Sequence, residues 1–223
     1  RSYGTMIFGE NGVGPTVTMG NSADSHSIFK VEEGSFLTIN GGTFNLSSDS
    51  SNKVTRLMQN FGTTVINNGT FNGDIELWSC TVEGKNYDST VTINEGSFNG
   101  KLLRLSDSNF VLDDEDKFIV KGGSFTDIAN AVKYATSGAT ITLAENVTLS
   151  SSIVVTKSVT IDLNGKKIES SALVFYIMGK NVTFTIDANG GSISTTGSAV
   201  IWTNNGSDYA NPNVTVNGGT YSG

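Results

Sequence analysis

The sequence has very few of the residues on which many enzymes and disulfide-linked domains depend. Its 223 residues include two prolines, one cysteine and one histidine, His26. The single cysteine, Cys80, excludes an intrachain disulfide framework. We interpret it as a small core residue of a strand, with metal binding or nucleophilic chemistry as the alternatives. No apolar run is long enough to span a bilayer, and no basic segment followed by an apolar one marks a signal peptide.

Positive charge is also scarce. The formal net charge is −7, and Lys166 and Lys167 form the only adjacent basic pair. A protein that binds nucleic acid needs clustered cations to neutralise phosphates, so we expect no nucleic-acid partner. The hydrophobic fraction of 37% and the 26 glycines, together with many Thr, Ser, Asn and Val residues, favour a β-rich chain with many turns.

A phenylalanine recurs at a fixed interval of 27 residues. The phrases around it are LTINGGTF at 37–44, TVINNGTF at 64–71, VTINEGSF at 91–98 and FIVKGGSF at 118–125. A period of this size indicates a stack of supersecondary units that bury their apolar faces against each other. If each repeat is one turn of a β-coil, equivalent residues lie about 4.8 Å apart on neighbouring strands.

This register predicts columns of identical side chains along the stack. An aromatic and a β-branched column should lie inside, an asparagine column should form a ladder of amide hydrogen bonds, and a glycine column should supply positive φ at a corner. The columns are Phe44, Phe71, Phe98 and Phe125; Ile39, Ile66, Ile93 and Val120; Asn40, Asn67 and Asn94, followed by Lys121; and Gly42, Gly69, Gly96 and Gly123.

The second part of the chain begins with a helical pattern. Ile128, Ala131, Val132 and Ala135 share one face of a helix predicted over 126–137. We expect Thr126 to cap its start, Asp127 to favour the positive end of the dipole and Gly138 to end it. Strands then resume with less regular intervals, 25 residues from Ile168 to Ile193 and 28 from there to Tyr221. The predicted organisation is a β-helix segment over 1–125 and a cap helix with a second β-helix segment over 126–223.

These residues carry a resemblance to a known family. The helix followed by GATITLAENVTLSSSIVVTKSVTIDLNGKKI, with the recurring VTINGGTF phrase, resembles the right-handed parallel β-helix proteins of the pectate-lyase-like superfamily, and above all long repeat-containing surface proteins of gut-type anaerobic bacteria. The resemblance covers most of the chain. It implies coils of about 25–27 residues, a bacterial cell-surface or extracellular location, and a host or dietary glycan or a surface protein as partner. Members include lyases, hydrolases, phage tailspikes and adhesins, so the fold alone does not choose the function.

The enzymatic alternative is a polysaccharide lyase or glycoside hydrolase of this fold. A lyase needs acids beside an Arg or Lys base, and Arg104 could approach Glu76 one coil earlier. The spacing of Asp162 and Asp187 predicts that these carboxylates stack about 5 Å apart, within the range that glycoside hydrolysis requires. An exposed charge pair and a repeated turn phrase explain these patterns without chemistry, and we expect no catalysis.

Two further sets of residues are candidates for binding. Asp113, Asp114 and Asp116 could offer oxygen ligands to calcium, but their spacing differs from that of a 12-residue calcium loop, and a solvated turn is the favoured interpretation. Trp78, Trp202 and Tyr209 lie in or near stretches rich in Asn, Gly and Ser, as aromatic residues of sugar-binding grooves do. Core packing is the alternative for both tryptophans.

The sequence thus predicts a non-catalytic extracellular module, either an adhesin-like or a stalk segment of a bacterial surface protein that binds glycans. A phage tailspike segment is a further alternative. The chain opens within a phrase and closes on VTVNGGTY, another copy of the repeat, so we expect a segment of a longer protein. Open strand edges at the two ends of the stack predict self-association.

Overall fold

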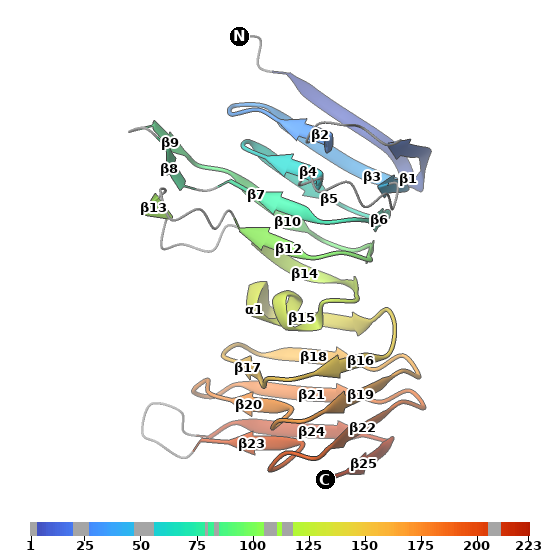
Figure 1. Ribbon diagram of the computed structural model, residues 1–223, viewed down its shortest axis with the longest axis vertical. Helices are drawn as coiled ribbons and strands as arrows, with labels where there is room; N and C mark the ends of the chain where they lie inside the picture. Colours follow the sequence, from blue (N-terminus) through green and yellow to red (C-terminus); the bar gives the residue numbers. More distant parts are fainter. Residues whose placement is uncertain are drawn as a thin grey trace. The chain divides into compact units, whose positions relative to one another are not determined.

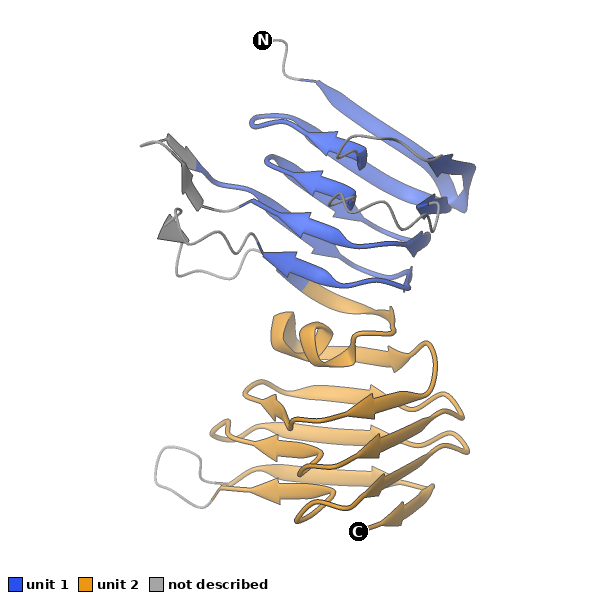
Figure 2. Ribbon diagram, viewed as in Figure 1, with its two compact units in different colours: residues 1–119 blue, residues 120–223 orange. Residues whose placement is uncertain are grey.

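The computed structural model describes residues 4–19, 27–46, 56–78, 80–82, 85–104, 111–112, 118–204 and 211–223. The chain is an all-β parallel solenoid of about six turns with one short helix (Figure 1). It divides into two compact units, residues 1–119 and 120–223 (Figure 2). The expected fold class is confirmed.

Unit 1 is built from parallel stacks of strands, and the long strands β1 and β3 each span two of the positions that separate strands occupy in the later coils. β3 pairs through its first half with β5 and through its second half with β6, and β4 pairs with β2 and β7. The strands are β1 (Thr5–Met19), β2 (Ser27–Val31), β3 (Phe36–Leu46), β4 (Arg56–Asn60), β5 (Thr63–Ile66), β6 (Thr70–Asn72), β7 (Ile75–Leu77), β8 (Cys80–Val82), β9 (Lys85–Tyr87), β10 (Thr90–Ile93), β11 (Ser97–Phe98), β12 (Leu102–Arg104) and β13 (Val111–Leu112).

The predicted 27-residue register is present in unit 1. Phe71 pairs with Phe44 and with Phe98 on the neighbouring strands, and the rings stack with centroids 5.3 and 4.9 Å apart. All three rings are buried, as is the column of Ile39, Ile66 and Ile93. These columns form the central part of the core. Full burial of each such side chain contributes about 1.5–3 kcal/mol to stability.

Amide ladders run along the outside of the same coils. Asn94 Nδ2 donates to Asn67 Oδ1 and Asn67 Nδ2 donates to Asn40 Oδ1, both at 2.7 Å, which confirms the predicted ladder. A second ladder joins Asn99 to Asn72 and Asn72 to Asn45, both at 2.6 Å. The predicted glycine corner is also present: Gly69 has φ +136°, and a Cβ there would lie 3.1 Å from the Phe71 ring.

One small sheet departs from the parallel pattern. β8 pairs antiparallel with β9 and with β13, in a separate three-stranded sheet. Cys80 is the first residue of β8, and its side chain lies outside the described residues.

Unit 2 is also built from parallel stacks of strands, with coils of variable length. Hydrogen bonds between neighbouring coils join residues 21, 25 and 30 positions apart, and Ile193 pairs with both Ile168 and Tyr221, as expected. The strands are β14 (Phe118–Phe125), most of which lies in this unit, β15 (Ala135–Leu143), β16 (Val147–Leu149), β17 (Ile153–Val155), β18 (Val159–Asp162), β19 (Lys167–Ser170), β20 (Phe175–Ile177), β21 (Thr183–Asp187), β22 (Ser192–Thr195), β23 (Ile201–Thr203), β24 (Asn213–Asn217) and β25 (Thr220–Ser222).

The helix α1 (Ile128–Tyr134) is shorter than the predicted 126–137. Thr126 is not its cap: Asp127 Oδ1 accepts from the amide of Asn130 at 3.2 Å, because the carboxylate stands at the N-cap position itself. Gly138 does not end it either, since the chain turns into β15 at Ala135. The predicted apolar stripe is buried, and Tyr134 adds to it.

Candidate functional site

The strongest candidate surface is a column of outward side chains on the sheet of β17, β20 and β23 in unit 2. Tyr176 pairs with Val154 on one side and with Trp202 on the other. The strand neighbours of Val154 and Tyr176 point inward and are buried: Ile153, Val155, Phe175 and Ile177. Val154 is 45% exposed and Trp202 is 52% exposed. We call Val154, Tyr176 and Trp202 the outward column.

An amide completes this surface. Asn204 follows β23, and its Nδ2 donates to the hydroxyl of Tyr176 at 3.1 Å. This bond crosses from one coil to the next and restrains the Tyr176 ring beside Trp202. Half-exposed aromatic side chains can cover the apolar face of a sugar ring, while a neighbouring amide can exchange hydrogen bonds with its hydroxyls. The outward column therefore has the chemistry of a sugar-binding surface.

Trp78, the second tryptophan candidate, has a different environment in unit 1. Its ring packs on Phe61 with centroids 4.7 Å apart, and Tyr87 contacts the same phenylalanine at 5.6 Å. The indole Nε1 donates to Glu76 Oε2 at 2.9 Å. The ring face and the N–H of Trp78 thus both have partners within the protein.

Glu76 is the most buried carboxylate among the described residues. Its side chain is 9% exposed, and Oε1 lies 3.4 Å from Nε of Arg56. A second Arg56 nitrogen, Nη1, lies 3.8 Å from Asp74 Oδ2. The backbone register sets Glu76 beside Leu103 and Arg104 beside Leu77. Glu76 thus has a cation beside one oxygen and an indole N–H on the other, which indicates a structural role.

Asp162 and Asp187 are partners in the parallel register of β18 and β21, as predicted. Each carboxylate accepts an amide from the next coil: Asn189 Nδ2 donates to Asp162 Oδ1 at 2.8 Å, and Asn217 Nδ2 donates to Asp187 Oδ1 at 2.7 Å. The main-chain amide of Asn164 also donates to Asp162 Oδ1 at 2.7 Å. These bonds make the pair part of a polar ladder, similar to the asparagine ladders of unit 1.

Tyr221 lies near this ladder on the last described coil. Burial, with a further contribution from the negative charge of Asp187, raises the pKa of its hydroxyl. The unfolded chain therefore loses this proton at lower pH than the folded chain. The contribution of Tyr221 to the free energy of unfolding is fully present below the ordinary tyrosine pKa, and it falls as the pH rises from there through the raised pKa of the folded state.

We expect the stability of the protein to fall less steeply above pH 10 in Tyr221→Phe than in the parent. The difference in unfolding midpoint between the two proteins, measured in urea at pH 8 and pH 11, isolates this residue from the other tyrosines and the lysines. An unchanged difference at the two pH values would contradict the assignment.

Several predicted candidates fall outside the described residues. These are Tyr209 and the acidic residues Asp113, Asp114 and Asp116. Within the described part of the chain, no group of three or more His, Cys, Asp or Glu side chains is arranged to hold a metal ion. No helix found there is long and apolar enough to cross a membrane.

No family model, curated protein or solved structure matches this chain.

Proposed function

We propose that this chain is a non-catalytic, extracellular β-helix module that binds glycans through the outward column, as an adhesin-like or stalk segment of a bacterial surface protein. The observation that carries the proposal is the exposure of Trp202 next to Tyr176 on a regular, parallel sheet. A tryptophan exposed to 52% costs free energy in water unless a partner covers it. A solenoid side offers an extended surface for a polymeric ligand.

The states of the acidic side chains support binding rather than turnover. Glu76 pairs with Arg56 and accepts a hydrogen bond from the Trp78 indole. Asp162 and Asp187 each accept a hydrogen bond from an asparagine amide. A carboxylate that serves as general acid or base must reach the proton that it transfers. These groups are instead engaged in bonds that hold neighbouring coils together.

The proposal predicts that Trp202→Ala weakens glycan binding at least about tenfold, because a central aromatic anchor commonly contributes more than 1.4 kcal/mol. A glycan array with host and plant polysaccharides identifies the ligand, and calorimetric titration measures its affinity. Tyr176→Ala should weaken binding as well. Stability should change little for Trp202→Ala, since the side chain is half exposed.

The matched control is Trp78→Phe, which removes the other tryptophan while retaining an aromatic ring in the packed cluster of unit 1. It should bind as the parent does. Equal affinity of the parent and Trp202→Ala for every ligand of the array would contradict the proposed site. Conversion of the bound polysaccharide to shorter or unsaturated products would favour the lyase or hydrolase alternative.

A further inference from the structure

Asparagine-glycine pairs recur at the corners of both units. In such a pair the main-chain nitrogen of the glycine can attack the side-chain carbonyl carbon of the asparagine, and the glycine has no Cβ to hinder the approach. The reactivity of each pair in the folded protein depends on what holds the asparagine side chain. The pairs in the described chain begin at Asn11, Asn40, Asn68, Asn72, Asn99, Asn164, Asn189 and Asn217, while Asn205 and Gly206 lie outside it.

Most of these side chains are held by a neighbouring coil. The carboxamide must turn its carbon toward the following glycine before it can react, and this movement breaks any bond to the next coil. Each lost hydrogen bond slows the reaction by up to about tenfold. Six asparagines donate such a bond from Nδ2: Asn40 to Gly9 O, Asn72 to Asn45, Asn99 to Asn72, Asn164 to Leu143 O, Asn189 to Asp162 and Asn217 to Asp187.

Asn68 has a different partner. Its Oδ1 accepts a hydrogen bond from the main-chain nitrogen of Gly69, the next residue, at 2.7 Å. Because a carbonyl bond is about 1.2 Å long, the Asn68 Cγ lies within about 3.9 Å of this nitrogen, close to the separation of about 3–3.5 Å in a near-attack conformer. A rotation about χ2, which is a soft torsion in asparagine, brings Cγ toward the nitrogen and breaks no bond to another coil.

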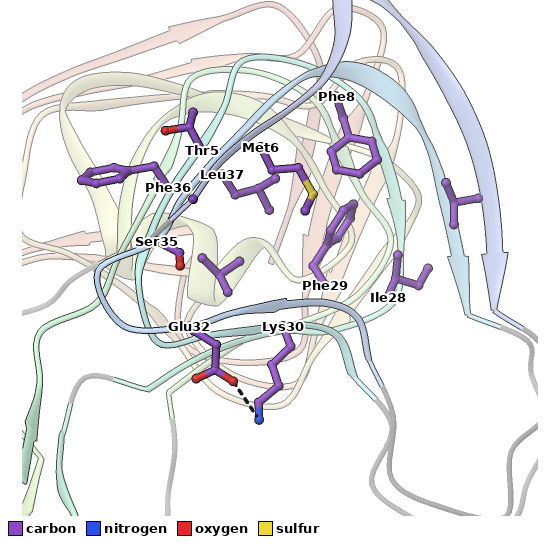
Figure 3. Close-up of a pocket in the computed structure, with 13 residues that line it drawn as sticks. Thr5, Met6, Phe8, Ile28, Phe29, Lys30, Glu32, Ser35, Phe36 and Leu37 are labelled. Atoms are coloured by element: carbon purple, nitrogen blue, oxygen red, sulfur yellow. Dashed lines mark ion pairs between the residues drawn. The ribbon is translucent and has the colours of Figure 1, made fainter. Parts of the chain in front are cut away.

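The surroundings of Asn68 let water in and ammonia out. The side chain is exposed, and together with Glu10 it lines a polar cavity of about 370 Å³. A larger cavity of unit 1, of about 540 Å³, is lined by apolar side chains such as Met6, Phe8 and Phe29 and contains no asparagine-glycine pair (Figure 3). Asn68 therefore has both the geometry and the solvent access that the reaction needs.

We propose that Asn68 and Gly69 form a spontaneous modification site, at which Asn68 is converted to aspartate and isoaspartate. In the first step Gly69 N bonds to Asn68 Cγ, the Cγ–Nδ2 bond breaks, and the side-chain nitrogen leaves as ammonia with the proton from Gly69 N. Water then adds to one of the two carbonyl carbons of the cyclic imide and opens the ring. Opening at one carbonyl yields aspartate, and opening at the other yields isoaspartate, in which the chain continues through the former side chain. This chemistry does not depend on glycan binding.

Both products alter a tightly built corner of unit 1. Each adds a negative charge next to Asn67, whose amide belongs to the first ladder. Isoaspartate also lengthens the main chain by one carbon just before Gly69, which has φ +136° and stands two residues before the buried Phe71 ring. Unit 1 should therefore lose stability as the protein ages, and the loss should grow with the fraction of isoaspartate at this position.

Peptide mapping by mass spectrometry tests the site. The folded parent is incubated in mildly alkaline buffer and digested at intervals, and fragmentation assigns the aspartate and isoaspartate forms to each position. Asn68 should convert at least about tenfold faster than Asn72 and Asn99, which hold ladder positions in the same unit. In urea, where the unfolded chain has no ladders, the three rates should converge.

Asn11 is the matched control for exposure. It is exposed and precedes a glycine, but in the described chain its side chain accepts no bond from Gly12, so it should convert more slowly than Asn68. Equal rates of Asn68 and Asn99 in the folded protein, conversion of Asn11 as fast as that of Asn68, or a lead of Asn68 that persists unchanged in urea would each overturn the proposal.

Asn68→Gln tests the consequence for stability. The variant keeps a carboxamide, but its longer side chain must close a larger ring and does so far less readily. After the same incubation it should gain no carboxylate at this position and should keep its urea midpoint while the midpoint of the parent falls. An equal fall in the parent and the variant would show that ageing at Asn68 does not weaken unit 1.

Discussion

Phe71→Ala should lower the free energy of unfolding of unit 1 by about 3–5 kcal/mol. The ring is fully buried and stacks between Phe44 and Phe98, nearly parallel to the latter with an interplanar angle of 3°. The substitution leaves a cavity in the middle of a column and removes both stacking contacts. Because each coil of a solenoid packs only on its neighbours, no other part of the core can fill the space.

Urea unfolding measures this loss best in a Trp202→Phe background, where Trp78 is the only tryptophan and its fluorescence reports on unit 1. Phe36→Ala is the matched control, since this side chain is 54% exposed and its removal should change stability by less than about 1 kcal/mol. A loss below about 1 kcal/mol for Phe71→Ala would show that the aromatic column is not the centre of the core.

Glu76→Ala should cost about 2–3 kcal/mol, the second largest effect that we expect. The substitution leaves the Arg56 guanidinium without the carboxylate 3.4 Å from Nε and leaves the Trp78 N–H without its acceptor. Removing one partner from a largely buried pair costs more than the pair contributes, because the remaining group stays desolvated. Arg56 retains 21% exposure of its side chain, so water offsets part of the loss.

Glu76→Gln separates the two contributions. It keeps an oxygen acceptor for Trp78 and removes the charge opposite Arg56, so its loss of stability should be about half that of Glu76→Ala. Glu169→Ala, at an exposed position of β19, should leave stability unchanged within about 0.5 kcal/mol. Parent-like urea midpoints for both Glu76 variants would show that this cluster does not stabilise unit 1.

Much of unit 1 can be predicted because its repeats are strict. Identical residues 27 positions apart give the phenylalanine column and the Asn40, Asn67 and Asn94 ladder directly. The second ladder, Asn45 to Asn72 to Asn99, has the same spacing and could have been found by the same signal. The predicted N-cap, Thr126, is wrong, because Thr126 and Asp127 are adjacent and both residue types can cap a helix. Only the geometry shows that Asp127 accepts the amide of Asn130.

The candidate site of unit 2 was harder to predict. Coil lengths there vary, so the alignment of Tyr176 with Trp202 cannot be read from one fixed period. Tyr176 was missed, although the alternation in Phe175, Tyr176 and Ile177 places it outside. Trp78 and Trp202 both occur in alternating apolar strands, and sequence does not distinguish them. The structure does, because Phe61 covers one ring while the other is half exposed.

The most direct test of the account is to incubate the parent protein with the polysaccharide that it binds best on the array, and to follow binding and polymer length in the same sample. We predict saturable binding, lost in Trp202→Ala, with no shortening of the polymer and no absorbance from unsaturated uronate products, with or without calcium. Shortened or unsaturated products from the parent would contradict the account of a non-catalytic glycan-binding module.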